Sequence, residues 1–195
     1  MRIGFVLLAA GLGKRFGENK LLTPLCGRPL FEYVLSQLPL EAFADGVVVV
    51  SDADVREMAK SRGIRCVAND RPETGIGRSI RLGTRALGEV DACMYIVADQ
   101  PLLRKGTIEA MALGYAPDSI LSLAHDGKRG NPVIFPASLR GELATLEDRE
   151  YGIKVIHAHM DLLRLYDIKD KAELMDVDTS GDLKRMVKLI APANE

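Results

Sequence analysis

Three short stretches of the chain, residues 5–8, 47–50 and 94–97, consist entirely of apolar residues. A strand with one face in water alternates apolar and polar side chains, whereas a continuous apolar run indicates that both faces are covered. Each run is followed by a longer segment with the spacing of an amphipathic helix. This alternation favours a three-layer α/β/α fold around a mainly parallel, Rossmann-like sheet.

The same patterns predict the order of elements along the rest of the chain. Strands are expected at residues 3–10, 46–51, 64–68, 92–98, 119–124, 132–135, 153–157 and 164–168. Helices are expected at residues 29–38, 53–62, 78–87, 105–114, 137–146 and 181–190. Because no repeat, low-complexity tract or Pro/Ser-rich linker divides the sequence, we expect residues 1–195 to form a single domain.

The charge balance argues against two classes of partner. The chain has 26 Lys plus Arg against 27 Asp plus Glu, so neither nucleic acid nor an anionic membrane surface is indicated. The three cysteines are widely spaced and form no CxxC pair, which favours a reducing compartment, with the cytoplasm as the expected location. The first apolar run is shorter than the roughly 18 residues that cross a bilayer, and we interpret it as a buried strand rather than a signal peptide.

A basic, glycine-rich segment follows the first predicted strand. Gly11 and Gly13 let the backbone approach a phosphate closely, and Lys14, Arg15 and Lys20 bring three cations to the same place. Parallel sheets bind ligands beyond the carboxyl ends of their strands, so this position favours a phosphate site. A flexible turn in which the glycines serve only the backbone geometry is the alternative.

Two well-known phosphate-binding loops do not fit this segment. A dinucleotide-binding fingerprint would need glycine where the chain has Phe16. A Walker A loop needs Ser or Thr after its Gly-Lys pair, where the chain has Arg15. The segment therefore predicts a phosphate site of another kind.

Carboxylates follow one predicted strand and precede the last predicted helix. Asp99 comes directly after residues 92–98 and should face the same edge of the sheet as the glycine-rich turn. Asp176 and Asp178 share one side of an extended segment, and Asp178 is the preferred second carboxylate. Since Mg²⁺ takes one or two protein carboxylates and fills its other positions with water and phosphate oxygens, this set would suffice. Capping and turn formation are the alternative roles for these acids.

Several short motifs extend over nearly the whole chain, at residues 8–17, 20–22, 25–30, 75–83, 98–101, 130–132 and 176–183. Their order and coverage resemble the MobA-like nucleotidyltransferases. Within that family the chain is most similar to the molybdenum cofactor cytidylyltransferases, which transfer CMP from CTP to the terminal phosphate of molybdopterin and release pyrophosphate. The resemblance implies a Mg²⁺-dependent enzyme with CTP and a small phosphorylated acceptor, molybdopterin, as substrates. A molybdenum hydroxylase apoenzyme or its chaperone is the implied protein partner.

The resemblance also implies roles for individual residues. Arg15 and Lys20 would be catalytic cations, the first on the triphosphate and the second at the reacting phosphate. Asp99 would also be catalytic and would hold Mg²⁺ together with Asp178. The implied nucleotide contacts are Leu8, Ala9, Ala10, Gly11, Gly13, Arg15, Lys20, Gly77, Ser79 and Asp99. For Ser79, a hydroxyl at a helix N-terminus is the alternative.

Ala10 bears on the choice of base, because in this family Leu-Ala-Ala-Gly is associated with CTP and Leu-Ala-Gly-Gly with GTP. The chain departs from the family pattern at residues 130–132, 146–150 and 180–181, which lie on the acceptor side in the family. The acceptor is therefore open to alternatives, such as a sugar phosphate or methylerythritol phosphate. A nucleotide-binding accessory protein without turnover is the alternative from a different class.

Overall fold

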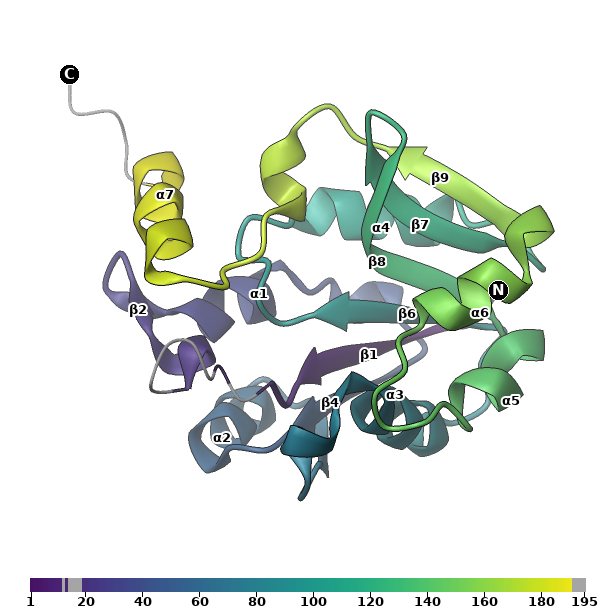
Figure 1. The fold of residues 1–195 in the computed structure, drawn as a ribbon, viewed down its shortest axis with the longest axis horizontal. Helices are drawn as coiled ribbons and strands as arrows, with labels where there is room; N and C mark the ends of the chain where they lie inside the picture. Colours follow the sequence, from purple (N-terminus) through teal and green to yellow (C-terminus); the bar gives the residue numbers. More distant parts are fainter. Residues whose placement is uncertain (12, 14–18, 191–195) are drawn as a thin grey trace.

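A seven-stranded sheet forms the centre of the protein in a computed structural model that describes residues 1–11, 13 and 19–190. The strands lie side by side in the order β5-β4-β1-β6-β8-β7-β9 (Figure 1). Their bounds are β1 Ile3–Ala9, β4 Asp45–Val50, β5 Arg65–Ala68, β6 Ala92–Val97, β7 Ile120–His125, β8 Lys128–Pro136 and β9 Leu163–Asp167. A separate two-stranded ribbon pairs β2 Pro24–Leu25 with β3 Arg28–Pro29.

The sheet is mainly parallel, as predicted. β1 runs parallel to both β4 and β6, and β7 runs parallel to β9. β8 pairs antiparallel with β6 on one side and with β7 on the other. Because β8 runs against β6, its first residues lie toward the edge at which β6 ends.

Helices cover both faces of the sheet. Their bounds are α1 Leu30–Gln37, α2 Ala53–Ser61, α3 Ile76–Ala86, α4 Lys105–Leu113, α5 Arg140–Leu143, α6 Ile153–Ala158 and α7 Ser180–Ile190. Buried side chains of α1, α2, α4 and α7 share one apolar core, and those of α3, α5 and α6 share the other. The predicted three-layer α/β/α fold is therefore confirmed.

The alternation of side chains along β1 shows why its sequence is continuously apolar. Phe5 and Leu7 belong to the core under α1 and α2, whereas Val6 belongs to the core under α3. All three are at most 2% exposed. Both faces of the strand are thus dry, as the unbroken apolar run indicated.

One predicted strand is wrong. Residues 153–157 are rich in β-branched residues, yet they form helix α6. Val155 and Ile156 are buried side by side in the core that α3 shares, while Ile153 and Lys154 are exposed. Burial of two consecutive residues fits a helix face and not a strand with one buried face, so packing overrode the local β-propensity. The helix expected at residues 137–146 is also shorter, since it begins with a 3-10 turn before α5.

The N-terminal end of α3 is fixed against the loop at residues 146–150. Gly77 N–H donates to the carbonyl of Asp148 over 3.0 Å, and a Cβ at Gly77 would stand 1.9 Å from the carbonyl oxygen of Glu147. Gly75 adopts φ +128°, a conformation that favours glycine. Arg81 of α3 also donates hydrogen bonds to this loop. These glycines allow the helix and the loop to approach closely.

Among the residues that the structure describes, none of the helices is long and apolar enough to cross a membrane.

We expect Gly77→Ala to lower the free energy of unfolding by about 1–3 kcal/mol, because the added methyl group overpacks a contact with backbone. Urea unfolding measures this change. Gly106→Ala is a matched control, since Gly106 is also the second residue of its helix, α4, and an added Cβ there would meet nothing within 4 Å. Equal stability of the two variants would contradict the packing argument.

Candidate nucleotide and phosphate site

Three residues far apart in the chain meet at the carboxyl edge of the sheet. The ammonium of Lys20 lies 2.8 Å from Asp99 Oδ2 and 3.1 Å from Asp178 Oδ1. Lys20 begins a 3-10 turn whose first residues are capped by the side chain of Asn19. The backbone N–H of Val177 donates to the carbonyl of Asp99 over 3.0 Å, which ties the C-terminal segment to the end of β6.

Lys20 stays a cation in this setting. Its side chain is only 13% exposed, and burial by itself lowers the pKa of an ammonium. The charge of Asp99 and the hydrogen bonds to Asp99 and Asp178 outweigh that effect and raise the pKa of Lys20 above its ordinary 10.5. The positive charge of Lys20 therefore lies at the edge of the sheet where the parallel strands β1 and β6 end.

The structure separates the roles of the acids near α7. Asp182 accepts hydrogen bonds from the backbone N–H and the hydroxyl of Thr179, and Thr179 Oγ1 accepts one in return from Asp182 N–H. This pair caps α7, which leaves the Asp178 carboxylate to contact Lys20. Asp176 is an exposed residue, but partial removal of water from its carboxylate and the nearby charge of Asp99 raise its pKa to about 6.

The carboxylates of Asp99 and Asp178 fit a divalent cation by their chemistry. Both lie within hydrogen-bond distance of the same positive group, the Lys20 ammonium, so they converge on one point. Oxygen ligands of this kind suit Mg²⁺ or Mn²⁺ when substrate phosphates and water complete the shell. Within residues 1–11, 13 and 19–190 no group of three or more His, Cys, Asp or Glu side chains stands close enough to hold a metal by itself.

A cavity of about 200 Å³ lies beside this cluster. β1 and β6 are neighbours in the sheet, so the chain leaves both strands at the same edge. The residues around the cavity are Leu8, Ala10, Gly11, Gly13, Lys20, Leu21, Pro72, Gly75, Ile76, Ser79, Val97, Ala98 and Asp99. Most of the residues predicted to contact a nucleotide thus surround one space, while Arg15 lies outside the described residues.

Two of the residues predicted to contact a nucleotide, Ala9 and Gly77, do not line this cavity. The side chain of Ala9 packs in the core under α1 and α2, because successive residues of β1 alternate between the two faces. Gly77 does not line the cavity, and its N–H is already paired with the loop at residues 146–150. The glycine there serves the packing of α3.

A buried asparagine, which the sequence analysis did not single out, holds Ser79. Asn69 is 2% exposed, and its Nδ2 donates to Ser79 Oγ over 3.0 Å. Its Oδ1 accepts from Arg78 Nε and from the backbone N–H of Arg71. Ser79 does not cap α3, which begins at Ile76 without a side-chain cap. Asn69 follows β5 as Asp99 follows β6, so the same signal of a polar residue at a strand end would have found it.

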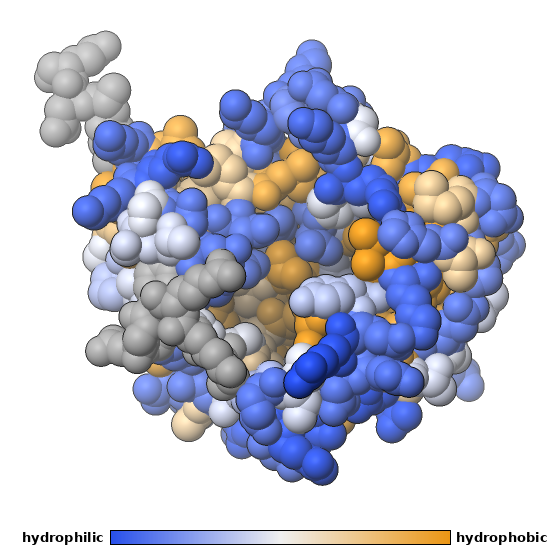
Figure 2. All heavy atoms as spheres, viewed as in Figure 1, coloured by the Kyte–Doolittle hydropathy of each residue, from blue (hydrophilic) through white to orange (hydrophobic). Residues whose placement is uncertain are grey.

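A second cavity, of about 640 Å³, adjoins the first. Leu8, Ile76 and Val97 line both, so the two spaces share a wall. Figure 2 shows this face of the molecule hollowed near its centre, with hydrophobic residues on the floor and hydrophilic residues around the rim. The arrangement offers a small polar chamber beside a larger, mainly apolar one.

The match to a family model assigns the chain to a class of enzymes, the nucleotidyltransferases. The model of the MobA-like NTP transferase domain matches residues 5–163, and the chain belongs to this family. A probable molybdenum cofactor guanylyltransferase of Bacillus licheniformis is 28% identical over 193 residues, which cover 93% of this chain and 94% of that protein. The purine catabolism protein PucB of Bacillus subtilis is 27% identical, with 89% and 90% covered.

Solved structures share the fold. Rv0371c from Mycobacterium tuberculosis H37Rv superposes with a TM-score of 0.81 at 20% identity, covering 96% of this chain and 98% of that one. A structure of Rv0371c in complex with manganese superposes with a TM-score of 0.76 at 21% identity, covering 97% of this chain and all of that one.

We expect Asn69→Ala to lower the free energy of unfolding by about 1–3 kcal/mol, since it takes the donor from the buried Ser79 hydroxyl and the acceptor from Arg78 Nε. Urea unfolding tests this. Asp70→Ala is the control, because the Asp70 side chain also binds Arg78 but is 70% exposed, and exposed pairs contribute about 0–1 kcal/mol. A larger loss for Asp70→Ala than for Asn69→Ala would contradict the assignment.

Proposed function

We propose that this protein transfers CMP from CTP to the terminal phosphate of molybdopterin and releases pyrophosphate. The observation that carries the proposal is the convergence of Lys20, Asp99 and Asp178 beside a cavity that Gly11 and Gly13 line. Family membership supports nucleotidyl transfer as the reaction. Similarity to the probable molybdenum cofactor guanylyltransferase of B. licheniformis supports molybdopterin as the acceptor.

In the proposed reaction an oxygen of the acceptor phosphate attacks the α-phosphorus of CTP. A new P–O bond forms to that oxygen, the bond from the α-phosphorus to the bridging oxygen breaks, and pyrophosphate leaves with the electron pair. Since a phosphate monoester is already an anion near neutral pH, no residue needs to remove a proton. The protein contributes alignment of the two anions and stabilisation of the charge that develops.

Each residue of the cluster has a part in this proposal. Lys20 supplies a cation whose position is fixed by two carboxylates before substrate binds, so little reorganisation is needed. Asp99 and Asp178 would hold a divalent ion, which neutralises phosphate charge when bound. Mg²⁺ is the proposed ion, and the manganese complex of Rv0371c supports a divalent metal in this fold. Gly11 and Gly13 would let backbone N–H groups approach the triphosphate.

The choice of CTP over GTP rests on Ala10. Ala10 lines the smaller cavity and is 4% exposed, so its methyl group occupies space at the wall. A cytosine ring needs less room there than a guanine ring. The name of the B. licheniformis relative favours GTP instead, which makes transfer of GMP the second candidate.

We expect Asp99→Asn and Lys20→Met to lower the turnover by about 100-fold or more, because each removes one preorganised charge from the reacting centre. Pyrophosphate release with CTP, Mg²⁺ and molybdopterin measures this. Lys105→Met is a matched control, since Lys105 also pairs with carboxylates but lies outside both cavities. Near wild-type turnover in either test variant would remove that residue from the mechanism.

The same assay on the wild-type protein separates the alternatives. Pyrophosphate release only with a sugar phosphate or methylerythritol phosphate would show that the acceptor is not molybdopterin. Tight nucleotide binding without any turnover would favour an accessory protein.

We expect the wild-type enzyme to prefer CTP to GTP in kcat/KM, and Ala10→Gly to shift that ratio toward GTP by about 10-fold or more, the usual effect of one methyl group in a pocket. Ala9→Gly is the matched control, because the neighbouring methyl group lies on the other face of β1. A wild-type preference for GTP would establish guanylyl transfer. An equal shift in both variants would show that Ala10 does not choose the base.

A further inference from the structure

We infer that Lys20 opposes the binding of a divalent cation to Asp99 and Asp178 until a nucleoside triphosphate is bound, so that metal and nucleotide bind together. This inference rests on the proposed function for the roles of the two carboxylates and of the triphosphate. It adds a coupling between the two ligands and assigns that coupling to one side chain.

The ammonium of Lys20 pairs with both carboxylates. Its Nζ lies 2.8 Å from Asp99 Oδ2 and 3.1 Å from Asp178 Oδ1. Asp176, the third acid of this region, forms no ion pair with Lys20 among the described residues. A divalent cation that takes Asp99 and Asp178 as ligands therefore binds close to the Lys20 ammonium, and the two positive charges repel each other.

The charge balance of this cluster disfavours a divalent cation that arrives alone. Two carboxylates and one ammonium leave a single net negative charge, which is half the charge of a divalent cation. The side chain of Asp178 is 58% exposed, so water screens its attraction, whereas the side chain of Lys20 is only 13% exposed. A triphosphate adds negative charges beside Lys20, which lines the smaller cavity. Nucleotide binding therefore reverses the balance in favour of the cation.

Lys20 can bind a phosphate without leaving the carboxylates. An ammonium has three N–H donors, and Asp99 and Asp178 each accept one. Among the described residues no other group accepts a hydrogen bond from Lys20. Gly11 and Gly13 line the same cavity as Lys20, so a triphosphate at these glycines lies near the third donor. The ammonium would then share its charge between carboxylate and phosphate oxygens.

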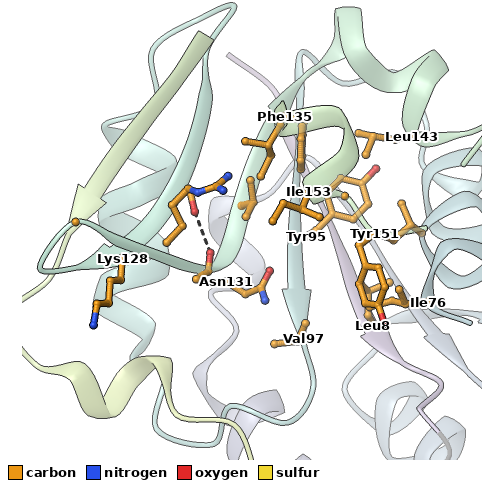
Figure 3. Close-up of a pocket in the computed structure, with 18 residues that line it drawn as sticks. Leu8, Ile76, Tyr95, Val97, Lys128, Asn131, Phe135, Leu143, Tyr151 and Ile153 are labelled. Atoms are coloured by element: carbon orange, nitrogen blue, oxygen red, sulfur yellow. Dashed lines mark hydrogen bonds between the residues drawn. The ribbon is translucent and has the colours of Figure 1, made fainter. Parts of the chain in front are cut away.

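Apolar surroundings make the repulsion between the two cations stronger than it would be on an open surface. Leu8, Ile76 and Val97 form the wall that the smaller cavity shares with the larger one (Figure 3). Side chains of this kind screen charges far less than water does. Removal of the charge at residue 20 should therefore change the affinity for a cation by a measurable factor.

The first test measures the binding of Mn²⁺ alone, without nucleotide, from the electron paramagnetic resonance signal of the free ion. Lys20→Met should bind Mn²⁺ at least about 10-fold more tightly than the wild-type protein, because the repelling charge is gone. Lys20→Arg keeps that charge and should keep the wild-type affinity. Lys105→Met is the matched control, since it also frees two carboxylates, Glu41 and Glu109, but at exposed positions outside both cavities.

The second test measures the binding of CTP and GTP in the presence of EDTA, so that no metal contributes. Lys20→Met should bind the nucleotide at least about 10-fold more weakly, the effect of losing one charge-assisted hydrogen bond. A side chain that only supports the fold would weaken the binding of both ligands when it is replaced. The coupling requires shifts of opposite sign.

The inference is overturned if Lys20→Met binds Mn²⁺ no more tightly than the wild-type protein, or if it binds metal-free nucleotide equally well. It is also overturned if the gain in Mn²⁺ affinity survives the addition of Asp178→Asn or is reproduced by Lys105→Met. Thermal unfolding shows whether Lys20→Met is folded, and Lys20→Gln is the deciding variant if it is not.

These outcomes are distinguishable from failure of the proposed function. Opposite shifts in Lys20→Met, without pyrophosphate release by the wild-type protein, would support the coupling and refute the proposed reaction. Pyrophosphate release by the wild-type protein, with an unchanged Mn²⁺ affinity in Lys20→Met, would refute the coupling and leave the reaction in place.

Discussion

Electrostatic repulsion between two carboxylates is the constraint on which the site depends. Asp99 and Asp178 both lie within about 3 Å of Lys20 Nζ, and without a cation between them their charges would drive them apart. Lys20 stands in that position and connects an early turn, the end of the central strand β6 and the segment before α7. Burying the Lys20 ammonium, which is 13% exposed, costs desolvation energy, so the value of the cluster lies in fixing the position of charge and not in stability.

Strands whose two faces are both buried could be predicted from the sequence. A helix and a close contact that depend on packing against a distant segment could not. Continuous apolar runs located β1, β4 and β6 because both faces of each strand are dry. The helix α6 was predicted as a strand because its local β-propensity gave no sign of the layer it packs against. The meeting of Lys20 and Asp99 followed from the rule that parallel strands end at one edge. The packing of Gly77 on Glu147 had no signal in the spacing of residues.

The two adjoining cavities would let one edge of the sheet serve both anionic substrates of the proposed reaction. They share the side chains of Leu8, Ile76 and Val97, so a molecule in one chamber lies next to a molecule in the other. Holding two reactants in adjacent chambers removes much of the entropic cost of bringing them together. The linings of the two chambers also differ, since Lys20 and Asp99 line the smaller one and aromatic rings line the larger one.

The attachment of Val177 to the end of β6 has a consequence for the newly made protein. Synthesis proceeds from the N-terminus, and the early strands have been made long before Asp178 leaves the ribosome. Until that residue arrives, Lys20 has one of its two anionic partners, and the pair of carboxylates that suits a divalent ion does not exist. A chain still in translation therefore cannot assemble the whole cluster of Lys20, Asp99 and Asp178, and with the roles proposed for them the reaction would begin only in molecules whose C-terminal segment has folded back onto the sheet.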